Sequence, residues 1–232
     1  DPDVVLVTKG DIYILNGKDG KIEWGPQRLP HPSNGDPAKA GPGGPPTVAD
    51  FDGDGKPEIG VAGGYYYVVF DPDGPKPILW KKATKDLSSR ITGSSVFDFE
   101  GDGKAEVVYA DECFMRVYRG TDGKVLFSRS TSTRTRTEYP VVADVDGDGR
   151  AEIVNVHNKY VVGCTSEPGW VQPKGGVYRG VTVFGDAKDN WVGTRRIWNQ
   201  HTYHVTNIDE DGKVPAVENQ NWKNVVLNNF RQ

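Results

Sequence analysis

The sequence lacks the features that several protein classes require. No apolar run approaches the roughly 20 residues of a membrane-spanning helix, so no membrane span is expected. A nucleophile elbow, a glycine-rich phosphate loop and a Cys/His metal signature are all absent, with 2 cysteines and 4 histidines in 232 residues. There is no Asn-x-Ser/Thr sequence and no signal peptide, and residue 1 is aspartate rather than methionine, so we expect a processed or trimmed segment.

Turn-forming residues are abundant by contrast. The chain has 29 glycines and 16 prolines and is only 36% hydrophobic, which indicates many turns rather than long helices. Its length allows one all-β domain or two small ones. Either has enough residues for a sizeable core.

The net charge of -4 is small but unevenly distributed. Three nine-residue windows, 50–58, 98–106 and 144–152, together hold 12 acidic and 3 basic residues, so they sum to -9 and the remainder to +5. Folding so many like charges into tight turns is unfavourable unless a cation neutralises them. The charge pattern therefore favours bound metal and disfavours a nucleic-acid partner.

The acidic windows recur inside a longer repeat. Segments 46–62, 94–110 and 140–156 align without gaps, and their first aspartates are 48 and 46 residues apart. Each segment has the pattern of a strand, an acidic loop and a second strand. A third strand then leads through an Asp-Gly turn to a fourth that carries Trp80 or Phe127.

Four strands in a period of roughly 40–50 residues are typical of a propeller blade. We therefore predict an all-β fold, a β-propeller of four-stranded antiparallel blades; a string of hairpins in a sandwich is the alternative. The polar run 128–138 is expected to be a surface connection between blades. The predicted blades cover about 1–29, 45–90, 91–137 and 138–190, and residues 191–232 form a closing strand and a C-terminal tail packed on the propeller.

Each acidic loop has Asp at position 1, an acid at 3, Asp at 5, Gly at 6 and Glu at 9. Calcium prefers about six to eight oxygen ligands. Alternate residues of a curled loop point inward, so we expect the acids at 1, 3 and 5 to converge, with the carbonyl at 7 and the Glu at 9 completing the cage. The predicted ligands are Asp50, Asp52, Asp54, Lys56 and Glu58; Asp98, Glu100, Asp102, Lys104 and Glu106; and Asp144, Asp146, Asp148, Arg150 and Glu152.

These loops differ from EF-hands, because the twelfth positions are Val61, Tyr109 and Asn155 and strands flank the loops. Magnesium fits less well, since it retains several waters. The second loop has Glu100 at position 3, whose longer side chain should shift or loosen that site. We expect about three calcium ions, one for each acidic window.

A degenerate fourth copy begins at Asn207. It has oxygen donors at positions 1, 3 and 5, namely Asn207, Asp209 and Asp211, but position 9 is Pro215. A fourth calcium ion and a metal-free turn both remain open for this loop.

The loops DFDGDGKPE, DFEGDGKAE and DVDGDGRAE, with their flanking strands, resemble the FG-GAP/VCBS repeats best known from integrin α-subunits. The resemblance covers about residues 1–190, and the later segment is similar to the stretch that follows the last repeat in large secreted bacterial FG-GAP proteins. It implies a seven-bladed propeller with calcium in some blades, exported to the cell surface or secreted. Such proteins commonly serve adhesion, surface structure or ligand recognition.

Only about four blades are visible in this chain. Residues 1–7 match 56–62, so the chain opens inside a further loop with its preceding strand absent. We expect a fragment of a longer propeller, or blades supplied by another chain. A four-bladed ring, closed by a strand at 201–207, is the alternative.

The sequence does not decide the roles of two pairs of residues. Cys113 and Cys164 could form a disulfide in an exported protein, whereas in the cytosol they would stay reduced. His201 and His204 are three residues apart and would face opposite sides of a strand, which disfavours chelation.

The sequence predicts a non-catalytic structural, adhesion or ligand-recognition module with a protein or glycan partner on a cell surface or matrix. One alternative is a lectin-like glycan-binding module that uses exposed aromatics such as Tyr65 and Trp170. Another is a calcium-stabilised polysaccharide lyase or hydrolase. A lyase needs basic, Tyr or His groups around an acidic-sugar cleft, and the sequence alone cannot assemble such a group.

Overall fold

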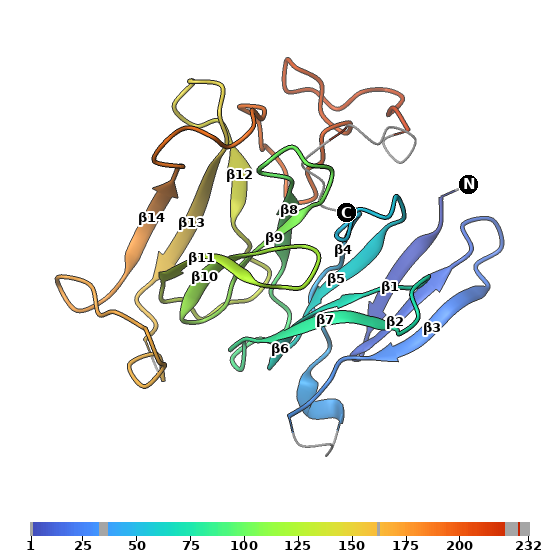
Figure 1. The fold of residues 1–232 in the computed structure, drawn as a ribbon, viewed down its shortest axis with the longest axis horizontal. Coiled ribbons are helices and arrows are strands. Elements are labelled where there is room, and N and C mark those ends of the chain that lie inside the picture. The colour runs from blue at the N-terminus through green and yellow to red at the C-terminus, as the bar shows by residue number, and fades with distance from the viewer. Residues whose placement is uncertain (1, 33–36, 162, 221–226, 228–232) are drawn as a thin grey trace.

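A computed structural model describes residues 2–32, 37–161, 163–220 and 227. The described part is all-β apart from one 3-10 helix, Pro37–Ala40, and it contains four separate antiparallel sheets (Figure 1). The predicted all-β class is therefore confirmed. Each sheet lies within one of the four sequence repeats.

The strands follow the chain order from sheet to sheet. The first sheet contains β1 (Val4–Thr8), β2 (Asp11–Leu15) and β3 (Ile22–Arg28). The second contains β4 (Thr47–Ala49), β5 (Glu58–Ala62), β6 (Tyr66–Phe70) and β7 (Ile78–Ala83). The third contains β8 (Ser94–Phe97), β9 (Glu106–Ala110), β10 (Phe114–Tyr118) and β11 (Val125–Ser130). The fourth contains β12 (Val141–Ala143), β13 (Glu152–Asn158) and β14 (Arg179–Phe184).

Consecutive sheets pack face to face and share their hydrophobic cores. Val61 and Phe70 of the second sheet pack with Ile12 of the first. A second core joins the second and third sheets, and a third joins the third and fourth. This explains why β5 and β9 are buried along their whole length and are nearly continuous apolar runs rather than alternating ones.

Aromatic side chains fill the central core. Tyr67, Trp80 and Tyr118 stack with ring centroids about 6 Å apart. The indole Nε1 of Trp80 donates a hydrogen bond to the carbonyl of Gly120, which lies in the β10–β11 turn of the next sheet. Trp80 is therefore both an apolar contact and a polar link between the second and third sheets.

The first strands of the three later sheets lie together. β8 contacts both β4 and β12, and the hydroxyl of Ser94 bonds to the Tyr67 hydroxyl at 2.8 Å. The acidic loops all leave the same ends of these strands, so the fold places the three loops on one side of the molecule (Figure 1).

The prediction that 128–138 is a surface connection is wrong in part: residues 128–130 belong to β11 and residues 131–133 and 135 are buried, whereas 134, 136 and 137 are exposed. Its Thr131, Ser132, Thr133 and Thr135 are at most 4% exposed. Burial is possible because the hydroxyls are hydrogen bonded: Thr131 to a His157 ring nitrogen, and Thr135 to the carboxylate of Asp86.

The strand predicted at 201–207 is absent, and this segment forms turns. The side-chain amide of Asn207 donates to the Thr202 carbonyl, and Arg195 Nη1 donates to the carbonyls of Val205 and Ile208. These hydrogen bonds occupy backbone carbonyls that, in a strand, would pair with a neighbouring strand. The last part of the predicted tail, 221–226 and 228–232, lies outside the described residues.

Candidate metal centres

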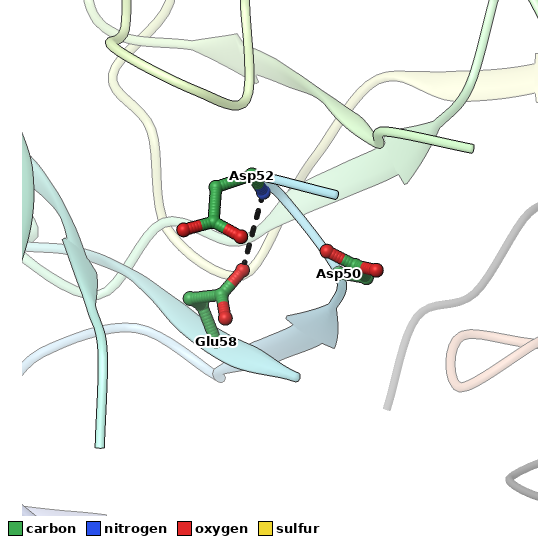
Figure 2. A group of neighbouring side chains, drawn as sticks. All are labelled: Asp50, Asp52 and Glu58. Atoms are coloured by element: carbon green, nitrogen blue, oxygen red, sulfur yellow. Dashed lines mark hydrogen bonds between the residues drawn. The ribbon is translucent and has the colours of Figure 1, made fainter. Parts of the chain in front are cut away.

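The three acidic loops have the same place in their sheets. Each follows the first strand, β4, β8 or β12, and ends at the glutamate that begins β5, β9 or β13. In each loop the acids at positions 1, 3 and 9 offer oxygen atoms that all lie within 4.8 Å of one another. We call these groups the acid triads: Asp50, Asp52 and Glu58; Asp98, Glu100 and Glu106; and Asp144, Asp146 and Glu152. Figure 2 shows the first triad, with its three carboxylates around one centre.

The aspartate at position 1 organises each loop. The carboxylate of Asp50 accepts hydrogen bonds from the N–H groups of Gly53 at 2.6 Å and Gly55 at 2.9 Å. The other two loops repeat both bonds. Gly53 and Gly55 have φ near +85°, where a side chain would be strained. The loop therefore curls around its first aspartate.

The glutamate at position 9 is buried in each triad, and in the third triad Asp144 is buried as well. Glu58 is 1% exposed, and its Oε2 accepts the N–H of Phe51 at 2.7 Å. Burial, together with the neighbouring charges of Asp52 and Asp50, raises the pKa of Glu58 to about 8. Burial likewise raises the pKa of Glu106 to about 9, with Glu100 as the next cause, and the pKa of Glu152 is also raised.

These triads fit a hard divalent cation. Three neighbouring carboxylates, at least one of them buried, are unfavourable together without a positive charge, and their oxygens are the ligands that calcium prefers. Glu100 joins its triad despite its longer side chain. The chemistry that calcium would supply is neutralisation of the three acids and a tie between the first two strands of a sheet.

The aspartate at position 5 lies outside the triads, although the sequence predicts it as a ligand. Its Oδ1 accepts the N–H of the residue at position 7 instead, as in the 2.8 Å bond from Lys56 to Asp54. Asp102 and Asp148 do the same at 3.0 and 2.7 Å. The carbonyl at position 7, in Lys56, Lys104 and Arg150, stays a predicted ligand.

The acids of the degenerate loop at 207–215, Asp209, Glu210 and Asp211, form no converging group of three in the described part of the chain. Asn207 Oδ1 accepts the N–H of His204, and Asp211 pairs with Lys213. The backbone of Asp209 lies in a turn, and its N–H donates a hydrogen bond to the Lys213 carbonyl. These contacts are those of a hydrogen-bonded turn.

The four histidines belong to none of the metal-binding groups in the described chain. His201 packs edge-on against Tyr139, and His204 pairs with Glu218. His157 is 8% exposed and lies between the hydroxyls of Thr131 and Thr182.

Cys113 and Cys164 form a disulfide with Cα atoms 5.3 Å apart. Both are fully buried and pack with Phe114 and Trp170. The bridge ties the β9–β10 turn to the long connection between β13 and β14. Both cysteines lie at the strand ends remote from the acidic loops.

Comparison with known proteins agrees with the loop pattern. Residues 1–61 and 98–154, about half of the chain, match the model of a family described as FG-GAP-like repeat. The crystal structure of the V. cholerae biofilm matrix protein Bap1 is similar, with 32% sequence identity and a TM-score of 0.62. The match covers 75% of this chain but only 27% of Bap1. A search of curated proteins found no significant match.

Proposed function

Because the chain belongs to the FG-GAP-like repeat family, we propose that it is a calcium-binding, non-catalytic module with a structural or adhesive role outside the cell. The observation that carries the proposal is the acid triad, which recurs at the same loop positions in three of the four sheets. The similarity to a biofilm matrix protein supports the structural or adhesive role.

We also propose that the four sheets are blades of a larger propeller. They pack face to face in chain order, and the first strands of three sheets lie together. The two end sheets carry exposed apolar side chains on their outer faces: Val4 and Ile22 in the first, and Val156, Val181 and Val183 in the fourth. Such patches mark surfaces that pack against further protein. Additional blades, from the same protein or another chain, are the partner that this geometry fits.

An extracellular location agrees with the disulfide, since such bonds persist in oxidising compartments. No helix in the described part of the chain is long and apolar enough to cross a membrane. The matrix protein that resembles this chain is the further support.

Calcium is proposed to fix the angle between the first two strands of a sheet. Each triad joins a loop that follows the first strand to the glutamate that begins the second. The unfolded loop has no such site, so ion binding favours the folded state. We expect chelation with EGTA to lower the melting temperature, and calcium but not an equal concentration of magnesium to restore it.

Elemental analysis should find about three calcium ions per chain, one for each triad. Asp52→Ala should remove one ion and reduce the calcium-dependent rise in melting temperature. Asp73→Ala is the matched control, because Asp73 is a 57% exposed acid near the same loop but outside the triad. A melting curve that does not respond to EGTA would contradict the proposal.

A further inference from the structure

A second site lies at the strand ends remote from the acidic loops. A pocket of about 300 Å³ is lined by Tyr65, Leu87, Cys113, Phe114 and Arg116, among others. Tyr65 precedes β6, Leu87 follows β7, and Cys113 precedes β10. The pocket therefore lies between the second and third sheets. Its volume is at the lower end of the range for small-molecule sites and suits one sugar ring better than a peptide chain.

Residues 163–178, which we call the strap, close one side of this pocket. The strap is part of the connection between the lower ends of β13 and β14 in Figure 1, whereas the acidic loop 144–152 leaves the upper end of β13. The disulfide at Cys164 attaches the strap to the pocket wall. Glu167 of the strap lines the pocket and pairs with Lys85 at 2.7 Å.

Arg116 is held in the pocket by a buried carboxylate. Its Nη1 donates to Asp111 Oδ2 at 2.9 Å, and Asp111 is 1% exposed. The other oxygen of Asp111 accepts the N–H groups of Cys113 and Phe114, both at 2.8 Å. The guanidinium also lies over the Phe114 ring, 4.2 Å from its centroid. Arg116 is therefore fixed by one carboxylate and one aromatic ring.

The guanidinium retains donors for a ligand. Within the described chain, its hydrogen bonds to Asp111 and to the Tyr118 hydroxyl both use Nη1. Nε and Nη2 are left to form the parallel pair of bonds by which arginine binds a carboxylate. The other cation in the pocket, Lys85, is already bonded to Glu167 and to the Gly163 carbonyl.

We propose that this pocket binds the carboxylate of a uronic acid residue in an acidic polysaccharide. Arg116 binds the carboxylate, Tyr65 and Leu87 pack against the apolar face of the sugar ring, and Glu167 accepts hydrogen bonds from ring hydroxyls. Asp111 and Glu167 offset the charges of Arg116 and Lys85, so the pocket suits a single carboxylate rather than a cluster of sulfates or phosphates.

The proposal rests on the adhesive role proposed above and names its ligand class. The two can fail separately, because the calcium sites and the pocket lie at opposite ends of the strands. If EGTA leaves the melting curve unchanged but uronate binding depends on Arg116, only the calcium proposal fails. If calcium stabilises the chain and no uronate binds, only the pocket proposal fails.

The test is calorimetric titration of the chain with a galacturonate trisaccharide at constant free calcium. The comparison ligand is the same trisaccharide with its carboxylates reduced to alcohols. We expect saturable binding of the acidic sugar and little or none of the neutral one. Arg116→Gln should weaken binding by roughly 10- to 100-fold, the range for losing a hydrogen bond to a charged group.

Two further variants distinguish a loss of the binding site from misfolding. Arg129→Gln is the matched control, since Arg129 lies over the Phe127 ring at 4.5 Å just as Arg116 lies over Phe114, but it does not line the pocket. Leu87→Trp fills the pocket from a residue that is 41% exposed and leaves the Arg116–Asp111 pair intact. We expect normal affinity for the first and a loss for the second.

Several results would overturn the proposal. These are equal affinity for the neutral trisaccharide, no saturable binding of the acidic one, or unchanged affinity in a folded Arg116→Gln variant. Tighter binding of a triglutamate peptide would assign the pocket to acidic peptides instead.

Discussion

At the scale of single residues, acids of the same type have different tasks within one loop. Asp52 belongs to the triad and also accepts the N–H of Asp54 at 3.0 Å, whereas Asp54 lies outside the triad and accepts the N–H of Lys56. Asp50 belongs to the triad and accepts two glycine N–H groups, so it holds more of the loop backbone than Asp52 does. The effect of a substitution on calcium affinity should therefore depend on its position in the loop and not only on the lost charge.

Asp54→Asn tests this difference against Asp52→Asn. The amide oxygen of asparagine can still accept the Lys56 N–H, so the loop should keep its shape in Asp54→Asn. Asp52→Asn removes one of three converging charges, so it should reduce the calcium affinity of the first loop more. Calorimetric calcium titration of both variants measures the two losses. A larger loss in Asp54→Asn would show that position 5 is the stronger ligand.

His157 gives a pH-dependent contribution to stability. Burial lowers its pKa, so the folded state favours the neutral imidazole. This contribution is complete above the unfolded pKa of about 6.5 and is lost as the pH falls toward the lower folded value. We therefore compare the free energy of unfolding at about pH 7.5 and about pH 5, with calcium in excess. It should decrease less in the His157→Gln variant than in the unsubstituted chain. Urea unfolding at both pH values checks this, and an equal loss in the two proteins would contradict it.

At the scale of elements, the disulfide is the main constraint on the strap. It joins residues 51 positions apart, and closing such a loop contributes about 4 kcal/mol on the chain-entropy model. The double substitution Cys113→Ser and Cys164→Ser should reduce the free energy of unfolding by about that amount. Urea unfolding under non-reducing conditions measures it. The control is the unsubstituted chain with its disulfide reduced, which should show the same decrease in the free energy of unfolding. An unchanged free energy in both proteins would refute the estimate.

The acidic loops and hairpins could be predicted because their information is local. Nine consecutive residues specify each loop, and an Asp-Gly pair specifies the turn that precedes β11. The buried hydroxyls were not predictable in this way. Thr135 is buried because Asp86, 49 residues earlier, accepts its hydrogen bond, and no local pattern records that contact.

The pocket and the failed strand have the same explanation. Arg116 alternates with apolar neighbours in β10, as an exposed strand residue would, and only the packing of Asp111 beneath it shows its orientation. The segment 201–207 has alternating polar and apolar residues, but Asn207 and Arg195 bond its backbone into turns. In both cases the outcome depends on side-chain hydrogen bonds that the strand pattern does not record.

At the scale of the whole molecule, the four sheets differ in how many of their faces are covered by a neighbouring sheet. The second and third sheets are covered on both sides, whereas the first and fourth have one outer face. On the fourth sheet, Val156 and Val181 are opposite each other in the β13–β14 register, and both are more than 40% exposed. The chain therefore ends its series with apolar faces on both sides.

These faces predict self-association of the isolated chain. The double substitution Val181→Lys and Val183→Lys should reduce it, because charged side chains on the outer face of β14 oppose sheet packing. Sedimentation velocity at several concentrations measures the effect. The matched control is Val171→Lys, a 64% exposed valine outside the sheets, which should leave association unchanged. A monomer at every concentration, with or without the lysines, would contradict the prediction.

The disulfide between Cys113 and Cys164 also sets how far the molecule can lengthen under tension. The bonded cysteines bracket 51 positions of chain, which if fully extended would span on the order of 170 Å. Pulling on the two ends cannot release that length while the bond is intact. The strands β10 and β11 of the third sheet and β12 and β13 of the fourth therefore cannot be drawn out in a stretched molecule, and added length comes only from the chain before Cys113 and after Cys164.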